Sequence, residues 1–232
     1  GENIRLDSTE GMDKISQTEK VTSPYFSDGS TTLAAANIIS SSLTDTNEKY
    51  FFGISHNSTP TVEEFNVAFG STNGYGVNLE SNTKSETEAI YKQYANILLA
   101  PTEVTGGFII SSTATDAAVS SGKDTEIFIL SARRSNMKDR INKGTWQINL
   151  SGSNSVGVNT GSLHLKDDSS TTDATATPVG DRYNIVSCSS AGVIAGAATL
   201  RNYGFFYPDM GIMVFSGAEL SASIPGKSDS RA

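Results

Sequence analysis

Residues 107–130 have the sequence GFIISSTATDAAVSSGKDTEIFIL, in which two short apolar runs flank a loop of small residues. The runs at 107–110 and 126–130 are rich in isoleucine and phenylalanine, which favour strands, and both are too short to be helices. Continuous apolar sequence is typical of a strand that is buried on both faces at the centre of a sheet. This stretch therefore predicts a β-sheet core around which the other segments are arranged.

Further strands are expected on both sides of this stretch. Phe65, Val67 and Phe69 alternate with Asn66 and Ala68, which is the period-two pattern of a half-buried strand. The other segments with alternating or continuous apolar residues are 50–54, 146–150, 163–165, 184–188, 204–207 and 211–215. So many short strands predict a mainly β fold, either a β-sandwich or a barrel-like domain.

One amphipathic helix is expected at about residues 85–99. Ser85 and Glu88 have the spacing of a capping box, which satisfies backbone donors at the start of a helix. Pro101 ends the segment, because proline cannot continue a helix. The apolar positions between these limits fall on one stripe, which predicts packing against the sheet: Ile90, Tyr94, Ile97 and Leu98.

Residues 1–47 are expected to form an irregular, extended arm, and residues 48–232 a β-rich structural domain. The first segment is polar with scattered apolar residues, as in an arm that becomes ordered by lying on a neighbouring molecule. An ordinary N-terminal meander explains the same pattern equally well. Gly1 stands where an initiator Met would, which indicates a processed chain or a part of a longer one.

The composition argues against several classes of protein. The 232 residues carry a formal net charge of −8 and have a pI of about 4.8, whereas broad nucleic-acid binding requires a basic surface. No apolar run approaches the ~20 residues of a membrane span, so we expect neither a nucleic-acid nor a membrane partner. The 33 Ser and 24 Thr residues favour turns and hydroxyl-lined surfaces. Cys188 is the only cysteine, which excludes an internal disulfide and predicts a small buried side chain.

Few residues carry reactive groups. His56, His164 and Cys188 could in principle form a Cys–His pair, but nothing in the sequence brings them together. His164 also falls on the polar face of its expected strand. The sequence therefore predicts no catalytic residue, and we do not expect an enzyme.

Two segments have some features of ligand-binding loops. Asp167, Asp168 and Asp173 form an oxygen-rich loop that could hold Ca²⁺ weakly, but the spacing lacks the glycine and the terminal glutamate of an EF-hand. An acidic, solvated turn explains this segment better. The glycine-rich residues 70–76 lack the Gly-Lys-Ser/Thr ending of a phosphate-binding loop, which favours a tight turn. We expect no metal and no cofactor.

One group of charges stands out from the acidic background. Five basic residues lie close together and are opposed by Asp139 alone: Arg133, Arg134, Lys138, Arg140 and Lys143. This basic island could dock an acidic patch on a partner, including another copy of the chain. The alternative is a short second helix over residues 135–141 with a solvated charged face, in which Met137 and Ile141 face inward.

Four segments, in order along the chain, are similar to segments of one group of proteins. They are residues 88–99 (EAIYKQYANILL), 126–140 (EIFIL followed by RR and MKDR), 144–151 (GTWQINLS) and 203–215 (YGFFYPDMGIMVF). Together they resemble virion structural proteins of large contractile-tailed marine bacteriophages, over about residues 50–224. The resemblance implies a virion subunit of the tail or baseplate whose partners are other copies of itself and neighbouring virion proteins. That family has no known catalytic residues, so none is transferred.

Two other functions stay open at this point. A capsid decoration or vertex protein fits the same resemblance. A glycan- or surface-binding adhesin or fibre module would need exposed aromatic residues beside Asn or Asp on loops, and Tyr75 beside Asn73 and Asn78 is the best candidate. The candidate interface residues are therefore Tyr75 and the basic island.

Overall fold

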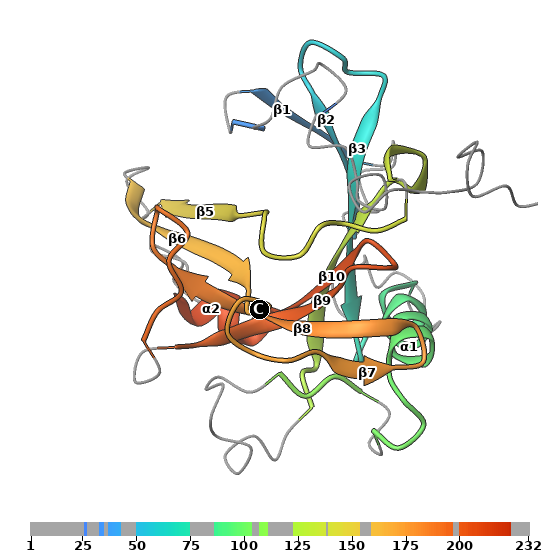
Figure 1. The fold of residues 1–232 in the computed structure, drawn as a ribbon. Helices are drawn as coiled ribbons and strands as arrows, with labels where there is room; N and C mark the ends of the chain where they lie inside the picture. The colour runs from blue at the N-terminus through green and yellow to red at the C-terminus, as the bar shows by residue number, and fades with distance from the viewer. Residues whose placement is uncertain are drawn as a thin grey trace, which may run out of the picture.

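The computed structural model describes residues 26, 33–34, 37–42, 50–74, 86–103, 107–110, 123–137, 139–153, 159–196 and 200–223 (Figure 1). Most of the expected arm lies outside these residues, as do Tyr75 and Lys138. Within the expected arm, residues 38–42 form strand β1 (Ile38–Ser42) instead of an irregular segment. The reason is that every residue of β1 pairs with the following strand, β2 (Phe51–His56).

The fold is mainly β, as predicted, and is built on one antiparallel sheet. Nine strands follow the order β1-β2-β3-β4-β10-β9-β8-β6-β5, and β7 pairs with β8 off this path. The remaining strands are β3 (Glu63–Ser71), β4 (Glu126–Ala132), β5 (Ile148–Ser153), β6 (Asn159–Asp167), β7 (Thr175–Thr177), β8 (Gly180–Cys188), β9 (Asn202–Tyr207) and β10 (Ile212–Ser216). The central position of β4 and β10 agrees with their continuous apolar sequences.

The predicted amphipathic helix is α1 (Glu86–Leu98), which packs on β3. Its buried side chains are Thr87, Tyr91, Ala95 and Leu98, whereas Ile97 is 39% exposed. The buried stripe is thus rotated from the predicted one and includes Tyr91, which is hydrogen-bonded to two neighbouring segments. The Tyr91 hydroxyl donates to the Asp124 carbonyl at 2.7 Å and accepts from the Phe108 amide at 3.1 Å.

The strand expected at residues 107–110 does not form. Phe108 and Ile110 are buried as predicted, but the segment stays outside the sheet. Its backbone amides are satisfied by side chains instead of a strand ladder, because Phe108 donates to Tyr91 and Ile110 donates to Asp124 Oδ2 at 2.8 Å. The apolar run is therefore an extended segment whose buried side chains complete the core between α1 and the sheet.

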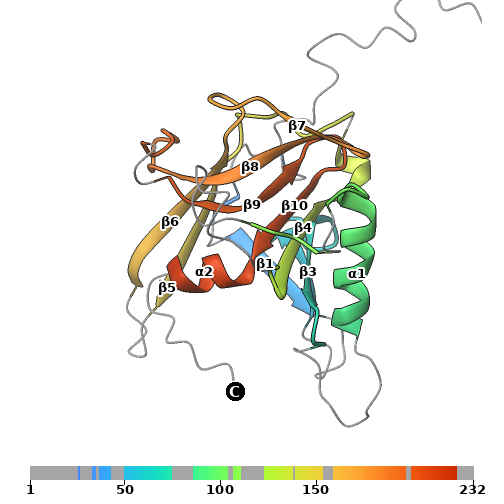
Figure 2. The same ribbon diagram turned by 90° about the horizontal axis from the view of Figure 1, so that it is seen from below.

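The sheet curls so strongly that distant strands share one core. Phe128 and Leu130 of β4 pack in the same cluster as Ile148 and Leu150 of β5, although four strands lie between β4 and β5 in the sheet. This cluster lies on the face away from α1, which has its own cluster around Tyr91 (Figure 2). The strand pattern predicts a β-sandwich or a barrel-like domain, and the structure is one strongly curled antiparallel sheet.

The short second helix does not lie where the sequence predicts it. Residues 134–136 form one turn of 3-10 helix, η2 (Arg134–Asn136), with Met137 buried behind it. A second α-helix, α2 (Gly217–Ser223), follows β10 directly. The Ser216 hydroxyl accepts from the Glu219 amide at 3.2 Å, so the capping-box spacing of Ser216 and Glu219 was the signal for this helix. In the described part of the chain, no helix has both the length and the apolar character needed to cross a bilayer.

Candidate interaction surface

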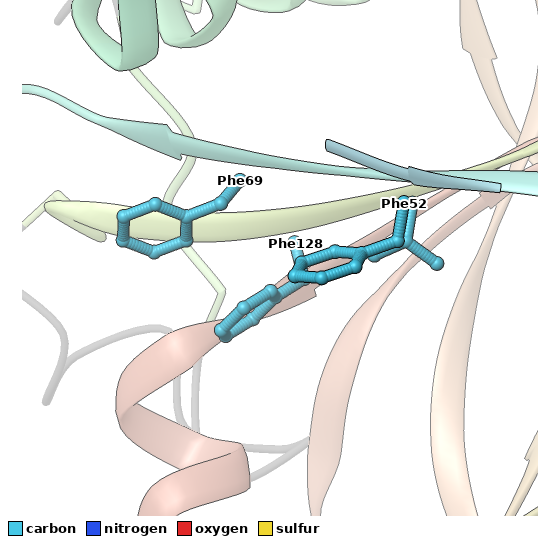
Figure 3. Close-up of a pocket in the computed structure, with 4 residues that line it drawn as sticks. Phe52, Phe69 and Phe128 are labelled. Atoms are coloured by element: carbon cyan, nitrogen blue, oxygen red, sulfur yellow. The ribbon is translucent and has the colours of Figure 1, made fainter. Parts of the chain in front are cut away.

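The sheet leaves a hollow of about 250 Å³ on the face away from α1 (Figure 3). Four apolar side chains from three adjacent strands line it, and we call them the aromatic trough: Phe52 of β2, Val67 and Phe69 of β3, and Phe128 of β4. Phe52 pairs with Val67, and Phe69 pairs with Phe128, across the strands. Side chains that pair directly in this way point to the same face of a sheet, so the four converge.

The aromatic trough exists because the curl of the sheet covers only part of this face. Phe128 packs on one side against the cluster that β5, β6 and α2 complete. Phe52, Val67 and Phe69 lie beyond it and, among the described residues, belong to neither core cluster. Their side chains are half-buried, and the rings of Phe69 and Phe128 stack obliquely with centroids 5.1 Å apart. Among the described residues, the trough thus continues a core-forming face beyond the part that β5, β6 and α2 cover, and Phe26 packs beside it on Phe65, with ring centroids 6.2 Å apart.

The chemistry of the trough is that of hydrophobic contact. All four lining side chains are apolar, whereas sites for small polar ligands place a few hydrogen-bonding groups among the apolar ones. Completing the burial of one half-buried phenylalanine or valine is worth on the order of 1 kcal/mol. The trough therefore favours an apolar partner and offers it a preformed, rigid surface.

The basic island is partly engaged within the chain itself. The Arg134 guanidinium donates to the carbonyls of Asp139 and Asp209, both at 3.1 Å, and so ties η2 to the turn between β9 and β10. The Lys143 ammonium donates to the Tyr183 hydroxyl at 2.6 Å and lies over its ring. Arg133 is exposed, and Arg140 is half-buried. The structure thus gives at least two members of the island a role in holding loops together.

The aspartates at 167 and 168 are not the solvated turn that the sequence predicts. Both are buried, at 0% and 2% exposure. Asp167 accepts from the Gly144 amide at 2.8 Å, and Asp168 accepts from the amide and the side chain of Asn184 at 2.9 and 2.8 Å. Burial raises the pKa of Asp168, although these hydrogen bonds act in the opposite direction. The pair fixes loops to the sheet, which gives these two acidic residues a structural role.

No group of three or more His, Cys, Asp or Glu side chains in the described ranges is placed to hold a metal ion. His56 is buried at the end of β2, where its Nδ1 lies 2.7 Å from the Ser58 hydroxyl. A buried histidine that is hydrogen-bonded within its own turn is typical of a structural histidine.

His164 and Cys188, in contrast, are brought together by the sheet. They are direct partners across β6 and β8, and Asn149 of β5 is the partner of His164 on its other side. His164 Nε2 lies 2.9 Å from the Ser162 hydroxyl, and Nδ1 lies 2.5 Å from Asn149 Oδ1. Burial raises the pKa of the Cys188 thiol, which Lys166 opposes. Asn149 thus places a neutral amide beside the imidazole, where a catalytic triad places a carboxylate.

The sequence did not single out the trough as a site. The alternation of Phe65, Val67 and Phe69 was visible, but it indicates a buried face as readily as an open one. No family model, no curated protein and no solved structure matches this chain. The function is therefore argued from the surface itself and from the sequence resemblance.

Proposed function

We propose that this chain is a structural subunit of a tailed-phage virion that assembles through protein–protein contacts into the tail or baseplate. The observation that carries the proposal is the aromatic trough, a preformed apolar surface on a sheet face that the chain does not cover with its described residues. The order of the four segments that resemble virion proteins supports the virion part. The partners are other copies of the chain and neighbouring virion proteins.

The trough is suited to be the anchor of an interface. Energetically dominant interface residues are often aromatic, cluster at the centre and fill well-packed pockets, while the rim excludes water. A standard interface buries about 800 Å² on each partner, so the trough supplies the centre and neighbouring polar residues supply the rim. Apolar burial of this kind stabilises a long-lived contact without any reactive group.

The assembly part is tested by mass photometry of the purified chain and two variants. Val67→Asp places a carboxylate at the centre of the trough, where an apolar partner would have to desolvate it. Ala176→Asp is the matched control, because Ala176 is exposed on β7, away from the trough strands. We expect oligomers for the wild type and for Ala176→Asp, and monomers for a folded Val67→Asp. Oligomers of unchanged size in Val67→Asp would show that the trough is not the anchor.

The virion part is tested on particles purified from the source of the chain. Mass spectrometry should detect the chain in the particles, and immunogold labelling should place it on the tail or baseplate. Label on the head would favour a capsid decoration or vertex protein instead. Particles that lack the chain would reject the virion assignment.

A further inference from the structure

Phe26 lies on the same face of the sheet as the aromatic trough, one step along β3. Phe65, Val67 and Phe69 alternate along this strand, so their side chains point to one face. The ring of Phe26 packs edge-on against the ring of Phe65, with centroids 6.2 Å apart. A point early in the sequence is thus fixed beside the trough. Which of its neighbours reaches the trough depends on the direction in which the chain passes Phe65.

The chain that follows Phe26 leads away from the trough. It continues to β1, which begins at Ile38, the partner of His56 at the end of β2. That end of β2 lies beside Glu63, at the start of β3. The trough lies in the opposite direction, further along β3 than Phe65. An extended chain that crosses Phe65 on its way to β1 therefore comes from the side of the trough.

The spacing of an extended chain then places Pro24 above Val67. Alternate residues of an extended chain point to the same side and are about 6.6 Å apart, and the same spacing holds along β3. Because Phe26 lies on Phe65, the residue two positions earlier falls on Val67, at the centre of the trough. That residue is Pro24. The opposite direction would place Asp28 there, where its carboxylate would lose its hydration in an apolar hollow.

A proline suits this position chemically. Its ring is apolar, and it has no backbone N–H that would need a partner above an apolar surface. Extended segments that contain proline are recognised by aromatic-lined grooves in several kinds of domain, and the trough supplies three phenylalanine rings. In an extended chain, Ser23 and Tyr25 point to the other side, where their hydroxyl groups keep their hydration.

We propose that residues 22–25 of the same chain occupy the aromatic trough in the free subunit, with Pro24 on Val67, and compete there with the partner that the trough binds in the assembly. We call residues 22–25 the N-terminal strap. The proposal rests on the assembly function above and adds its regulation. Only copies with an uncovered trough can associate, so a strap that covers about 90% of the troughs weakens association about tenfold.

Occupancy of the trough is tested with a disulfide between strap and trough in the full chain. Cys188→Ser removes the only cysteine, and Pro24→Cys is combined with Val67→Cys. A disulfide requires the two Cβ atoms to come within about 4.5 Å of each other. At a concentration where the chain is monomeric, we expect oxidation with diamide to form an intrachain disulfide, which intact mass spectrometry detects as the loss of two hydrogen atoms. Pro24→Cys with Ala176→Cys, on β7, is the matched control and should stay reduced.

The competition is tested by adding a charge to the strap. Pro24→Asp places a carboxylate against the trough and should release the strap. Oligomers should then form, in mass photometry, at about one tenth of the concentration that the wild type needs. Ser23→Asp adds the same charge to a neighbour that points away from the trough, and it should assemble as the wild type does. Circular dichroism checks that both variants are folded.

The outcomes separate the strap from the function on which it rests. An intrachain disulfide, together with a wild type and a Pro24→Asp variant that stay monomeric at every concentration, would support occupancy by the strap and contradict the assembly function. The absence of an intrachain disulfide, or disulfides between chains alone, would overturn the strap and leave the assembly function standing if the wild type forms oligomers. Equal assembly of the wild type and both charged variants would overturn the competition.

Discussion

Two buried tyrosines show how differently single hydroxyl groups contribute to this molecule. The Tyr91 hydroxyl bonds two backbone groups, the Asp124 carbonyl and the Phe108 amide. The Tyr207 hydroxyl is buried, bonds no backbone group in the described part of the chain and has the Arg182 guanidinium near it. A buried donor or acceptor that loses its partner costs about 1–3 kcal/mol, so the loss of the hydroxyl should cost more at Tyr91 than at Tyr207.

We expect Tyr91→Phe to lower the free energy of unfolding by about 1–3 kcal/mol, because two backbone groups lose their partner. Tyr207→Phe should cost less, since it keeps the ring, leaves no backbone group unpaired and leaves Arg182 bonded to Glu103. Urea denaturation at neutral pH measures both changes, and each variant controls for the loss of a hydroxyl in the other. Equal losses in the two variants would contradict this account.

Tyr207 also makes the stability depend on alkaline pH. Burial raises the pKa of Tyr207 to about 12, although Arg182 nearby acts to lower it. In the unfolded chain the hydroxyl ionises near its ordinary pKa of about 10. Between these values the unfolded state has lost its proton and the folded state has not, so stability falls as pH rises. The contribution is fully present below about pH 10 and is lost by about pH 12.

The expected loss is on the order of 2–3 kcal/mol over that range. Urea denaturation from neutral pH to the highest pH that the chain tolerates measures it. Tyr207→Phe should show a shallower alkaline decline than the wild type, and the difference isolates this residue from other groups. Parallel curves for the two proteins would show that Tyr207 ionises alike in both states.

At the scale of elements, the close packing of α1 on β3 depends on the absence of a side chain at Gly70. A methyl group added there would lie 3.1 Å from Ile127 Cγ1 and 3.1 Å from both N and Cα of Tyr91. The contact with Tyr91 is to helix backbone, which cannot turn away as a side chain does. Gly70 therefore sets how closely the helix approaches the sheet.

We expect Gly70→Ala to lower stability by about 1–3 kcal/mol, as overpacking does in a tight core. Gly196→Ala is the matched control, because a methyl group there meets no atom within 4 Å. Thermal unfolding of the two variants measures the contrast. A Gly70→Ala variant as stable as the control would mean that the helix shifts without cost.

The elements also show what the sequence could and could not predict. The strand alternation and the capping box at Ser85 are local, so β3 and α1 were predicted from them. The run at 107–110 was wrongly assigned to the sheet, because its amides are satisfied by Tyr91 and Asp124, which are distant in sequence. The buried stripe of α1 was also predicted on a slightly different face, because Tyr91 contacts the same distant residues.

The candidate site depended even more on tertiary structure. The trough residues are ordinary strand positions in sequence, and only the tertiary fold brings Phe128 against a core cluster and leaves Phe69, which is equally half-buried, outside it. The pairing of His164 with Cys188 likewise follows from the order of β6 and β8 in the sheet. A sequence pattern identifies which face is apolar, but not what covers it.

For the whole molecule, the balance of apolar and charged surface determines how copies associate. The chain has a net charge of −8, so copies repel one another at low salt. Raising the salt from about 0.1 M to about 1 M shortens the screening length from about 10 Å to about 3 Å, which weakens this repulsion and any contact through the basic island. An apolar contact through the trough is not weakened by screening, but hydrophobic association becomes weaker on cooling.

We therefore expect oligomers that persist or grow at high salt and that partly dissociate in the cold, as measured by mass photometry over both variables. The double variant Arg133→Glu, Arg134→Glu is compared with the wild type at high salt. If the trough drives assembly, the double variant should form the same oligomers as the wild type. If the wild-type oligomers dissociate at high salt but not on cooling, the contact is made by the basic island instead. The direction of the salt effect thus decides which of the two surfaces joins the copies.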